Sequence, residues 1–211
     1  MKYGILLVAF LLLSCSNEQK SDIEGLIIDP NIKNEVEKYI EDTPNSKRFN
    51  NDMQIYKNSF HLTSYTNDEL TASTTDFSKK SPFKSFYFWH DDLLRIDGAF
   101  GIFGGFGFDI QINDEKATLY HMLSSDDFPT YAYNETDDFI FRLEVPCTET
   151  KIVLSEMPDR EKQQVIYGYV EFKSGDFYTM SNSAVAGEKS ERDKLRNNMK
   201  IYFRSGFVNL N

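Results

Sequence analysis

Beyond residue 84 the chain acquires a period of two in its apolar residues. Residues 106–112 alternate Phe and Ile with Gly, Asp and Gln, the same period recurs at 139–145 and 166–172, and residues 201–208 are expected as a closing strand. A period of two places the apolar side chains of a strand on one face. Short turn signals separate these runs, which leaves no room for the crossovers that parallel pairing needs. We therefore expect a mainly β fold, an antiparallel β-sandwich or barrel of about 7–10 strands.

Turn signals mark where the expected strands end. Asn113–Glu115 separates the run at 106–112 from an antiparallel partner at 117–123. Ser174–Asp176 is expected to form a turn that leads into a strand at 177–180. Lys151–Leu154 is expected as a separate short strand, so the chain should reverse often within this part.

The first third of the chain has a different pattern. Asp29–Pro30 precedes apolar residues at helical spacing, which predicts one short helix that ends before Thr43–Pro44. A second short helix is a hypothesis for residues 47–61, while the polar stretch at 63–82 is expected to form a long loop. A capping-box pattern also permits a short helix within residues 187–200. The fold class is thus mainly β with one or two short N-terminal helices.

The first fifteen residues form a separate feature. Lys2 gives a basic start, Ile5–Leu13 is an unbroken apolar run of nine residues, and Ser14 follows directly before Cys15. Nine residues are too few to cross a bilayer as a helix, which needs about 20. A basic start, a short apolar stretch and a small-residue cleavage site are typical of an export signal that is later removed.

With Leu12–Ser14 directly before Cys15, this segment resembles a bacterial lipoprotein signal peptide with its lipobox. The resemblance implies that residues 1–14 are cut off and that the Cys15 thiol carries a diacylglyceryl group. Two or more acyl chains hold a protein stably at a bilayer. The residues Ser16–Glu18 are also similar to the export tags of Bacteroidota surface lipoproteins. A plain secretory signal is the alternative reading.

The resemblance also implies a location and a domain organisation. We expect a protein anchored through Cys15 to a membrane of the bacterial cell envelope, the outer membrane, and either periplasmic or exposed at the surface. Residues 15–28 should then be the lipidated cysteine with its spacer, and residues 29–211 a single β-rich domain. The lipid bilayer is thus the one partner that the sequence implies.

The composition is acidic. Asp and Glu number 33 and Lys and Arg 23, which gives a net charge of −10. Affinity for nucleic acid rests on neutralising phosphates with Lys and Arg, so we expect no nucleic-acid partner. Anionic lipid surfaces would repel the same charge, so a lipid anchor explains attachment to a membrane better than a basic patch.

Cysteine usage leaves little choice. The chain has two cysteines, and if Cys15 is lipidated then Cys147 has no disulfide partner within the chain. An unpaired thiol in an oxidising compartment is tolerated mainly when it is buried. We therefore expect Cys147 to be a buried structural residue at the end of a strand.

Residues 98–108 contain five of the eleven glycines, interleaved with phenylalanines. A strand rather than a helix follows and no Lys–Ser or Lys–Thr ends the run, so it is not a phosphate-binding loop. We expect a hairpin or bulged corner in which the phenylalanines pack inside. The alternative is an aromatic pocket for an apolar or sugar-like ligand. The residues of that pocket would be Trp89, His90, Phe100, Phe103 and Phe106.

The sequence His90–Asp92 is the best place to look for a metal or an acid–base pair. The three histidines form no HExxH or His-x-His pattern, and no carboxylates have EF-hand-like spacing. Neighbouring residues on a strand also point to opposite faces. We therefore expect a turn between two strands here, and neither a metal nor a cofactor.

Three classes of function fit these features. We expect a binding or structural domain for an unknown protein or small-molecule ligand, without catalysis. The first alternative is an immunity or inhibitor lipoprotein that neutralises a toxin or an envelope enzyme. The second is an envelope hydrolase that uses carboxylates, whose spacing in space is invisible in sequence. No Gly-x-Ser-x-Gly nucleophile motif is present.

Overall fold

A computed structural model describes residues 19–43, 54–73, 79–101, 104–181 and 191–209, and these form one helix and fifteen strands. The mainly β, largely antiparallel fold expected from the alternation is confirmed. In chain order the elements are β1 (Gln19–Lys20), β2 (Leu26–Ile28), α1 (Ile32–Tyr39), β3 (Glu41–Asp42), β4 (Gln54–Lys57), β5 (Phe60–Thr66), β6 (Glu69–Ser73), β7 (Phe83–His90), β8 (Leu93–Phe100), β9 (Gly105–Ile112), β10 (Ala117–Ser124), β11 (Tyr131–Ala132), β12 (Arg142–Leu154), β13 (Ile166–Ser174), β14 (Phe177–Met180) and β15 (Arg192–Phe207).

The sheet closes on itself. Strands β7, β8, β9, β10, β12, β13 and β15 pair in that order, each antiparallel to the next. The last residues of β15 then pair in parallel with β7, with Gly206 opposite Phe86 and Phe207 opposite Tyr87. A second parallel pair joins β2 to the end of β12. Closure removes the free edges that an open sheet would expose at these strands.

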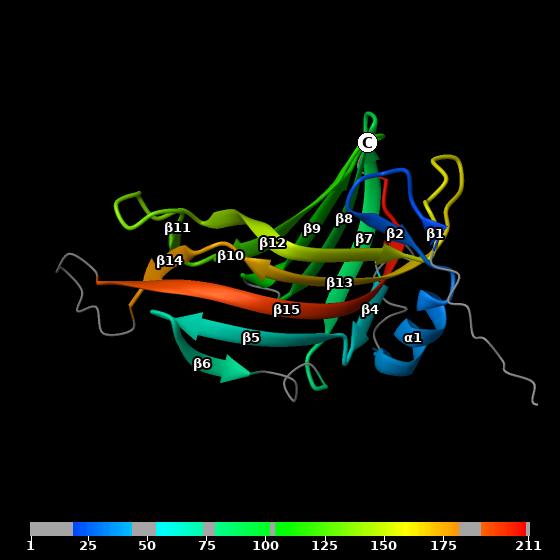
Figure 1. Ribbon diagram of the computed structural model, residues 1–211. Coiled ribbons are helices and arrows are strands. Elements are labelled where there is room, and N and C mark those ends of the chain that lie inside the picture. Colours follow the sequence, from blue (N-terminus) through cyan, green and yellow to red (C-terminus); the bar gives the residue numbers. More distant parts are fainter. Residues whose placement is uncertain (1–18, 44–53, 74–78, 102–103, 182–190, 210–211) are drawn as a thin grey trace, which may run out of the picture.

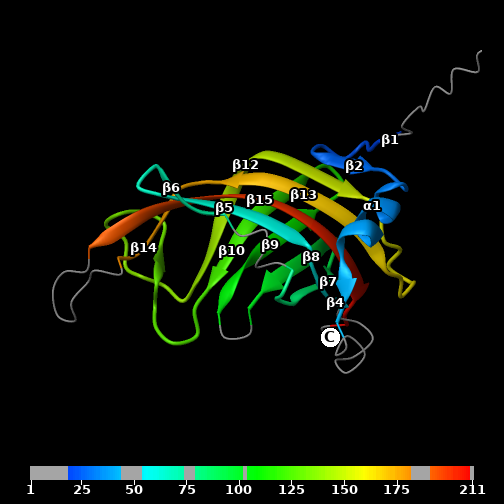
Figure 2. The same ribbon diagram turned by 90° about the horizontal axis from the view of Figure 1, so that it is seen from below.

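The closed sheet is flattened into two layers that cross (Figures 1 and 2). Strands β12, β13, β15, β5 and β6 form a front layer, and β7 to β10 form a rear layer behind it. Strand β12 belongs to both layers, since its first residues pair with β10 and its last residues pair with β13. The strand expected at 139–145 and the short strand expected at 151–154 are therefore one long strand that starts at Arg142.

Aromatic and aliphatic side chains fill the space between the layers. Phe83, Tyr87, Phe108, Phe172 and Phe203 are almost fully buried. The rings of Phe108 and Phe203, from opposite layers, have centroids 5.0 Å apart. Burial of one such side chain contributes roughly 1.5–3 kcal/mol. The period of two in the sequence thus corresponds to a packed interior.

A series of hydrogen bonds between polar side chains also joins the two layers. The ring of His121 on β10 donates from Nδ1 to Gly107 O and accepts at Nε2 from Asn197 Nδ2, both at 2.9 Å. Asn197 Oδ1 accepts in turn from the Ser64 hydroxyl at 2.8 Å. Burial lowers the pKa of His121 to about 4, so the ring is neutral. Because each of these groups has a partner, their burial is not penalised.

Three of the expectations for irregular or helical segments are wrong. The described part of 47–61 forms β4 and the start of β5 rather than a helix, and much of 63–82 forms the β5–β6 hairpin. The segment within 187–200 forms the start of β15 from Arg192 onward. Pairing of β5 with β15, more than a hundred residues apart in sequence, stabilises both as strands. Contacts of this kind override local composition.

The expected turn at Ser174–Asp176 is not a reversal. Both β13 and β14 run antiparallel to β15, with Lys173 opposite Asn198 and Phe177 opposite Leu195. The chain therefore continues along β15 after a local irregularity at Gly175. Other expected turns are present, including Asn113–Glu115 between β9 and β10.

The N-terminal helix is confirmed and lies on the outer face of the front layer. Helix α1 buries Ile32 and Val36 against Val153 and tyrosines of β13 and β15. Before it, β1 and β2 pair with each other and β2 pairs with β12, so residues 19–28 already belong to the sheet. No helix within the described residues is long and apolar enough to cross a membrane.

Candidate functional site: a polar groove on the front layer

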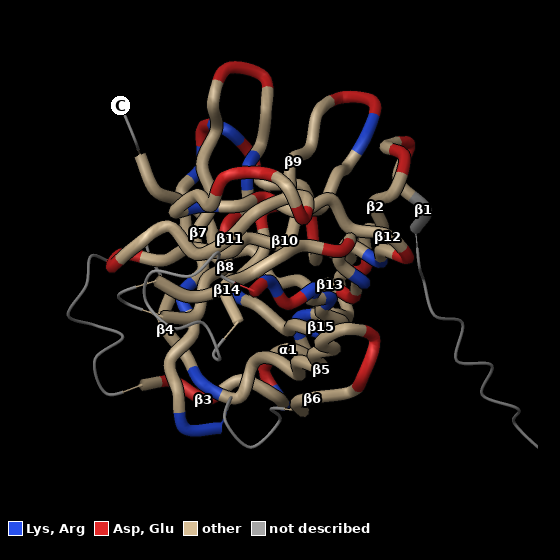
Figure 3. The backbone as a smooth tube through the Cα atoms, turned by 90° about the vertical axis from the view of Figure 1, so that its left-hand side faces the viewer, with Lys and Arg blue, Asp and Glu red and all other residues tan. Residues whose placement is uncertain are grey.

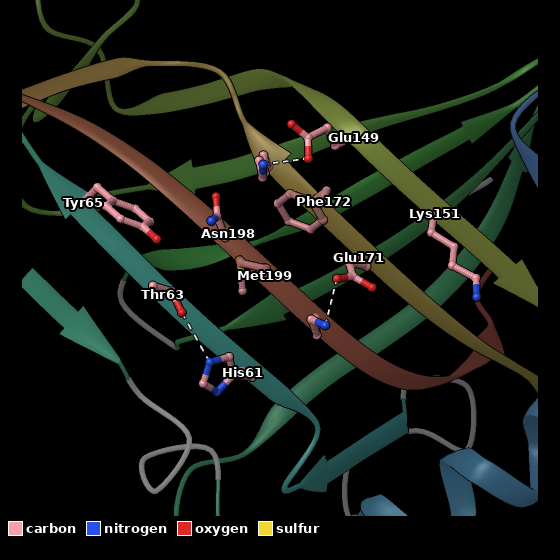
Figure 4. A pocket seen from close by; sticks show the side chains of 11 residues that line it. His61, Thr63, Tyr65, Glu149, Lys151, Glu171, Phe172, Asn198 and Met199 are labelled. Atoms are coloured by element: carbon pink, nitrogen blue, oxygen red, sulfur yellow. Dashed lines mark hydrogen bonds and ion pairs between the residues drawn. The ribbon is translucent and has the colours of Figure 1, made fainter. Parts of the chain in front are cut away.

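A groove of about 390 Å³ crosses the outer face of the front layer, over β12, β13, β15 and β5 (Figure 4). Phe172 and Met199 turn their side chains into the core, so the outward-facing residues of the groove are charged, polar or tyrosine. The lining residues are His61, Thr63 and Tyr65 of β5, Asn198, Met199 and Lys200 of β15, Glu171, Phe172 and Lys173 of β13, and Glu149 and Lys151 of β12.

Strand register brings four of these side chains into one row across the sheet. Lys151 lies opposite Glu171, Glu171 opposite Lys200, and Lys200 opposite His61. Neighbouring strands are about 4.8 Å apart, so the row spans roughly 14 Å. Three of its four members carry charge, and the charges alternate in sign.

A second row lies roughly 7 Å further along the strands. In it, Lys173 is opposite Asn198 and Asn198 is opposite Thr63. Glu149 joins this row from β12, where a β-bulge shifts the register just before Lys151. The bulge holds Glu149 at a φ of 48° and brings its carboxylate 2.6 Å from Lys173 Nζ. Bulges commonly re-aim a side chain in this way next to a site.

The Glu171 carboxylate is held in place from two sides. Lys200 Nζ lies 2.8 Å from one of its oxygens, and the Tyr169 hydroxyl donates to the other at 2.8 Å. The Lys200 ammonium, helped by Tyr169, keeps the pKa of Glu171 below its usual value. Glu171 is therefore ionised at neutral pH and oriented before any ligand arrives.

Lys151 differs from the other two lysines of the groove. Lys173 and Lys200 each form an ion pair with a glutamate, whereas the Lys151 ammonium has no ion pair or hydrogen bond with a residue that the structure describes. Its charge acts at longer range on Glu171. With three lysines to two glutamates, the groove is locally basic in a chain of net charge −10.

Asn198 carries an unsatisfied acceptor in the middle of the groove. Its Oδ1 atom is buried and accepts no hydrogen bond from the described residues. A buried acceptor without a partner costs about 1–3 kcal/mol.

Aromatic side chains border the groove at both ends. Tyr65 lies at one end, with the Arg196 guanidinium over its ring at 5.2 Å. Beyond the other end, Tyr202 stacks on Tyr39 of α1 with ring centroids 4.2 Å apart, and Tyr169 packs beside it. Helix α1 therefore covers the apolar part of this sheet face and leaves the two polar rows open.

The aromatic pocket suggested by the glycine-rich run is not assembled in one place. Phe100 and Phe106 lie together, with ring centroids 5.1 Å apart, and both pack against Phe60 at the core. Gly101 and Gly104 adopt φ values of 109° and 80° at the corner between β8 and β9, a conformation that favours glycine. Phe103 lies outside the described residues.

Trp89 and His90 lie at the opposite end of the β7–β8 hairpin. Phe83 pairs with Phe100 whereas His90 pairs with Leu93, which separates the two groups by roughly 20 Å. The turn expected at His90–Asp92 is present, and its side chains are exposed. The Arg160 guanidinium lies 4.2 Å from the Trp89 ring and bonds Asp92 at 3.0 Å. Neither Trp89 nor His90 lines the groove.

One buried carboxylate pair bears on the hydrolase alternative. Asp97 and Asp109 lie opposite each other on β8 and β9, on the outer face of the rear layer. Arg95 donates to both oxygens of Asp109, at 3.2 and 2.6 Å, and Gln111 donates at 2.6 Å. Burial, and then the charge of Asp109, raise the pKa of Asp97 to about 7. Because Asp109 is fully buried and committed to these partners, the pair fits a structural role better than a catalytic one.

Cys147 is half-buried against the core and is a free thiol. Burial raises the pKa of this thiol to about 12, so it is protonated at neutral pH. Since the thiolate is the nucleophile, Cys147 is chemically inert in this setting. Cys15 lies outside the described residues.

Sequence reasoning did not single out the groove. In the sequence, the groove corresponds to polar residues at every second position of several strands. Glu171 and Lys173 are one such pair, and His61 and Thr63 are another. These patterns indicate a solvated strand face and give no register between distant strands. No row of residues across the sheet is visible from them.

Among the described residues, no group of three or more His, Cys, Asp or Glu side chains is placed to hold a metal ion.

No protein-family model, no curated protein and no solved structure matches this chain. The geometry and charge of the groove are therefore the basis on which its function is inferred.

Proposed function

We propose that this protein is a membrane-anchored lipoprotein of the cell envelope that binds a ligand in the groove over β12, β13, β15 and β5. The anchor is supported by the apolar run that ends at Ser14–Cys15. Binding is supported by one observation above all. The strand register assembles two rows of oriented polar side chains on the part of the sheet face that helix α1 leaves open.

The chemistry of the groove favours binding over catalysis. The contact between the Thr63 hydroxyl and the His61 imidazole, from Oγ1 to Nε2, is long at 3.3 Å. Acyl transfer also requires donors that stabilise an oxyanion, often backbone N–H groups. Here β5 pairs with β15 on one side and with β6 on the other, so its backbone groups are committed to the ladders.

The anchor is tested by labelling cells that express the full chain with radioactive palmitate. We expect label in the wild-type protein and none in Cys15→Ala, because the thiol is the attachment point. Cys147→Ala is the matched control and should label normally. Label that persists in Cys15→Ala would rule out the anchor.

Binding is tested by filling the groove. The full chain, purified in detergent, is screened by thermal shift against a panel of soluble saccharides and peptides. Thr63→Tyr should abolish any shift seen with the wild type, because the larger side chain occupies the second row. Thr118→Tyr, on the outer face of β10, is the control and should leave the shift unchanged. A shift that survives Thr63→Tyr places binding elsewhere.

A second candidate function, inhibition of a protein, is favoured by the loop at 125–141. This loop carries four of the seven exposed large hydrophobic side chains in the described chain, Phe128, Tyr133, Ile140 and Phe141. It also contains five acidic residues and no Lys or Arg. Hydrogen bonds between Tyr131 and Ile140 hold it in shape. Figure 3 views the molecule from this end, with acidic residues in red along its loops.

An exposed apolar patch with an acidic surround fits a protein surface that is basic and partly apolar. We expect a stoichiometric basic protein to co-purify with the full chain if inhibition is the function. Phe128→Ala combined with Phe141→Ala should release that protein, whereas Leu70→Ala, an exposed apolar residue of β6, should not. Retention of the partner by the double variant would contradict this function.

A further inference from the structure

We infer that the groove over β12, β13, β15 and β5 takes an anionic saccharide, with its acidic group at Lys151 and its hydroxyls on the second row. This inference rests on the proposed binding function and adds the class of ligand. Its evidence is the charge, the hydrogen-bonding groups, the size and the borders of the groove.

Charge is the first piece of evidence. Two of the three groove lysines are neutralised by Glu149 and Glu171, and Lys151 is left without an ion pair among the described residues. The rest of the chain is acidic, so a basic site stands out against its surroundings. An anionic group beside an unpaired ammonium gains a charge-assisted hydrogen bond.

The polar groups of the floor suit hydroxyls. Glu171 is ionised and accepts hydrogen bonds, and the Thr63 hydroxyl both donates and accepts. Hydroxyl groups supply donors and acceptors together, whereas a simple inorganic anion supplies acceptors only. The groove therefore favours a ligand that carries several hydroxyl groups and one negative charge.

Size and borders agree with a short chain of sugar rings. The two rows span roughly 14 Å across the strands and 7 Å along them, which is enough for two or three rings. Among the described lining residues, the apolar side chains of Phe172 and Met199 face the core. Large apolar ligands and apolar peptides would remove water from the charged rows without offering them new hydrogen-bond partners. Tyr65 borders one end of the groove and supplies an aromatic face, one side of which Arg196 covers.

Isothermal titration of the full chain in detergent micelles tests the inference with four probes. The probes are a trisaccharide of uronic acids, a sulfated neutral trisaccharide, the unmodified neutral trisaccharide and inorganic sulfate. We expect the uronate or the sulfated sugar to bind more tightly than the neutral sugar and the free ion, and to weaken as salt is raised. The carboxylate and sulfate arms distinguish the two possible acidic groups.

Substitution of Lys151 gives the decisive comparison. Lys151→Ala should weaken binding of the acidic trisaccharide about tenfold, because one charge-assisted contact is lost. Lys151→Arg should restore most of it, and Lys116→Ala, an exposed lysine in the β9–β10 turn, should have no effect. Binding of the neutral trisaccharide should not change in any of the three.

Each other result has a definite meaning. Equal binding of neutral and acidic sugars, both lost in Thr63→Tyr, would overturn the anionic class while the proposed binding function stands. If inorganic sulfate binds as tightly as the sulfated trisaccharide, the sugar contributes nothing and the saccharide class is wrong. If none of the four probes binds while a peptide of the wider panel does, the inference fails and ligand binding in the groove survives.

Discussion

His121 is fully buried and Asp97 is half-buried, and burial favours the uncharged form of each side chain. Desolvation raises the pKa of a carboxyl and lowers the pKa of an imidazole, which gives about 7 for Asp97 and about 4 for His121. Their effects on stability therefore have opposite signs over the same range of pH. We therefore predict that the contributions of Asp97 and His121 to the pH dependence of the free energy of unfolding oppose each other.

Asp97→Asn should isolate the contribution of Asp97 to the pH dependence of the free energy of unfolding. The folded-state pKa of Asp97 lies above its ordinary value of 3.8, so the folded chain holds this proton more tightly and loses stability as pH rises from about 4 to 7. Asn stays uncharged beside Asp109. We expect the variant to unfold with a free energy about 1–3 kcal/mol higher than the wild type at pH 8, and with little difference at pH 4. Urea unfolding at the two pH values measures this, and a difference independent of pH would contradict it.

His121→Leu should isolate the contribution of His121 to the pH dependence of the free energy of unfolding. Because the folded-state pKa is lowered from 6.5 to about 4, this residue favours folding fully above pH 6.5, and that contribution is lost as pH falls towards 4. The variant leaves Asn197 without one partner, so we expect a loss of about 1–3 kcal/mol at pH 7.5. The loss should shrink as pH is lowered. Asn197→Leu in the same background serves as a double-mutant cycle, and purely additive losses would argue against the bond.

Helix α1 shows how an element depends on the surface beneath it. Eight residues are too few for a stable helix in isolation. Its stability comes from Ile32 and Val36, which pack on Val153 and on tyrosines of the sheet, and from the stacking of Tyr39 on Tyr202. The bulge of β12 is a second element-scale device, since one extra residue there turns Glu149 towards Lys173. Together these elements define where the groove begins and ends.

Val36→Ala tests the docking of the helix. Val36 is fully buried, so we expect a loss of about 1–3 kcal/mol and faster hydrogen exchange across α1. Glu37→Ala is the matched control, because the neighbouring Glu37 is exposed. Exchange rates in α1 that are the same in both variants would show that the helix does not depend on this contact.

At the scale of the whole molecule, closure of the sheet joins the end of the chain to its middle. The last residues of β15 pair with β7, Val208 N–H donates to Tyr87 O at 2.8 Å, and Phe207 packs on Tyr87. These contacts join sequence positions more than a hundred residues apart. The two layers are therefore fixed to each other at one side by β12 and at the other by β15.

A chain that ends at Ser205 should open this closure. We expect a loss of roughly 2–4 kcal/mol, since the partly buried ring of Phe207 and the last ladder hydrogen bonds are removed. Hydrogen exchange should rise in β7 while β13 stays protected. Removal of residues 210–211 alone is the control and should change neither quantity. Unchanged protection of β7 in the shorter chain would show that closure contributes little.

Much of the fold could be read from local patterns, and the errors share one cause. The strands at 106–112 and 117–123 and the helix after Asp29–Pro30 are present as expected. The segments expected as helix or loop became β4, β5, β6 and the start of β15. They are strands because β5 pairs with the distant β15, β4 pairs with β7, and β6 pairs with β5 in a hairpin.

The period of two marks which residues face inward in the strands at 106–112, 117–123 and 166–172, because this period is a local property of the backbone. The acidity of the chain and the apolar run before Ser14–Cys15 are also visible in the sequence alone. The row of Lys151, Glu171, Lys200 and His61 exists only in the folded sheet. Register between strands is fixed by burial of their inner faces against one common core, and that packing involves the whole chain at once.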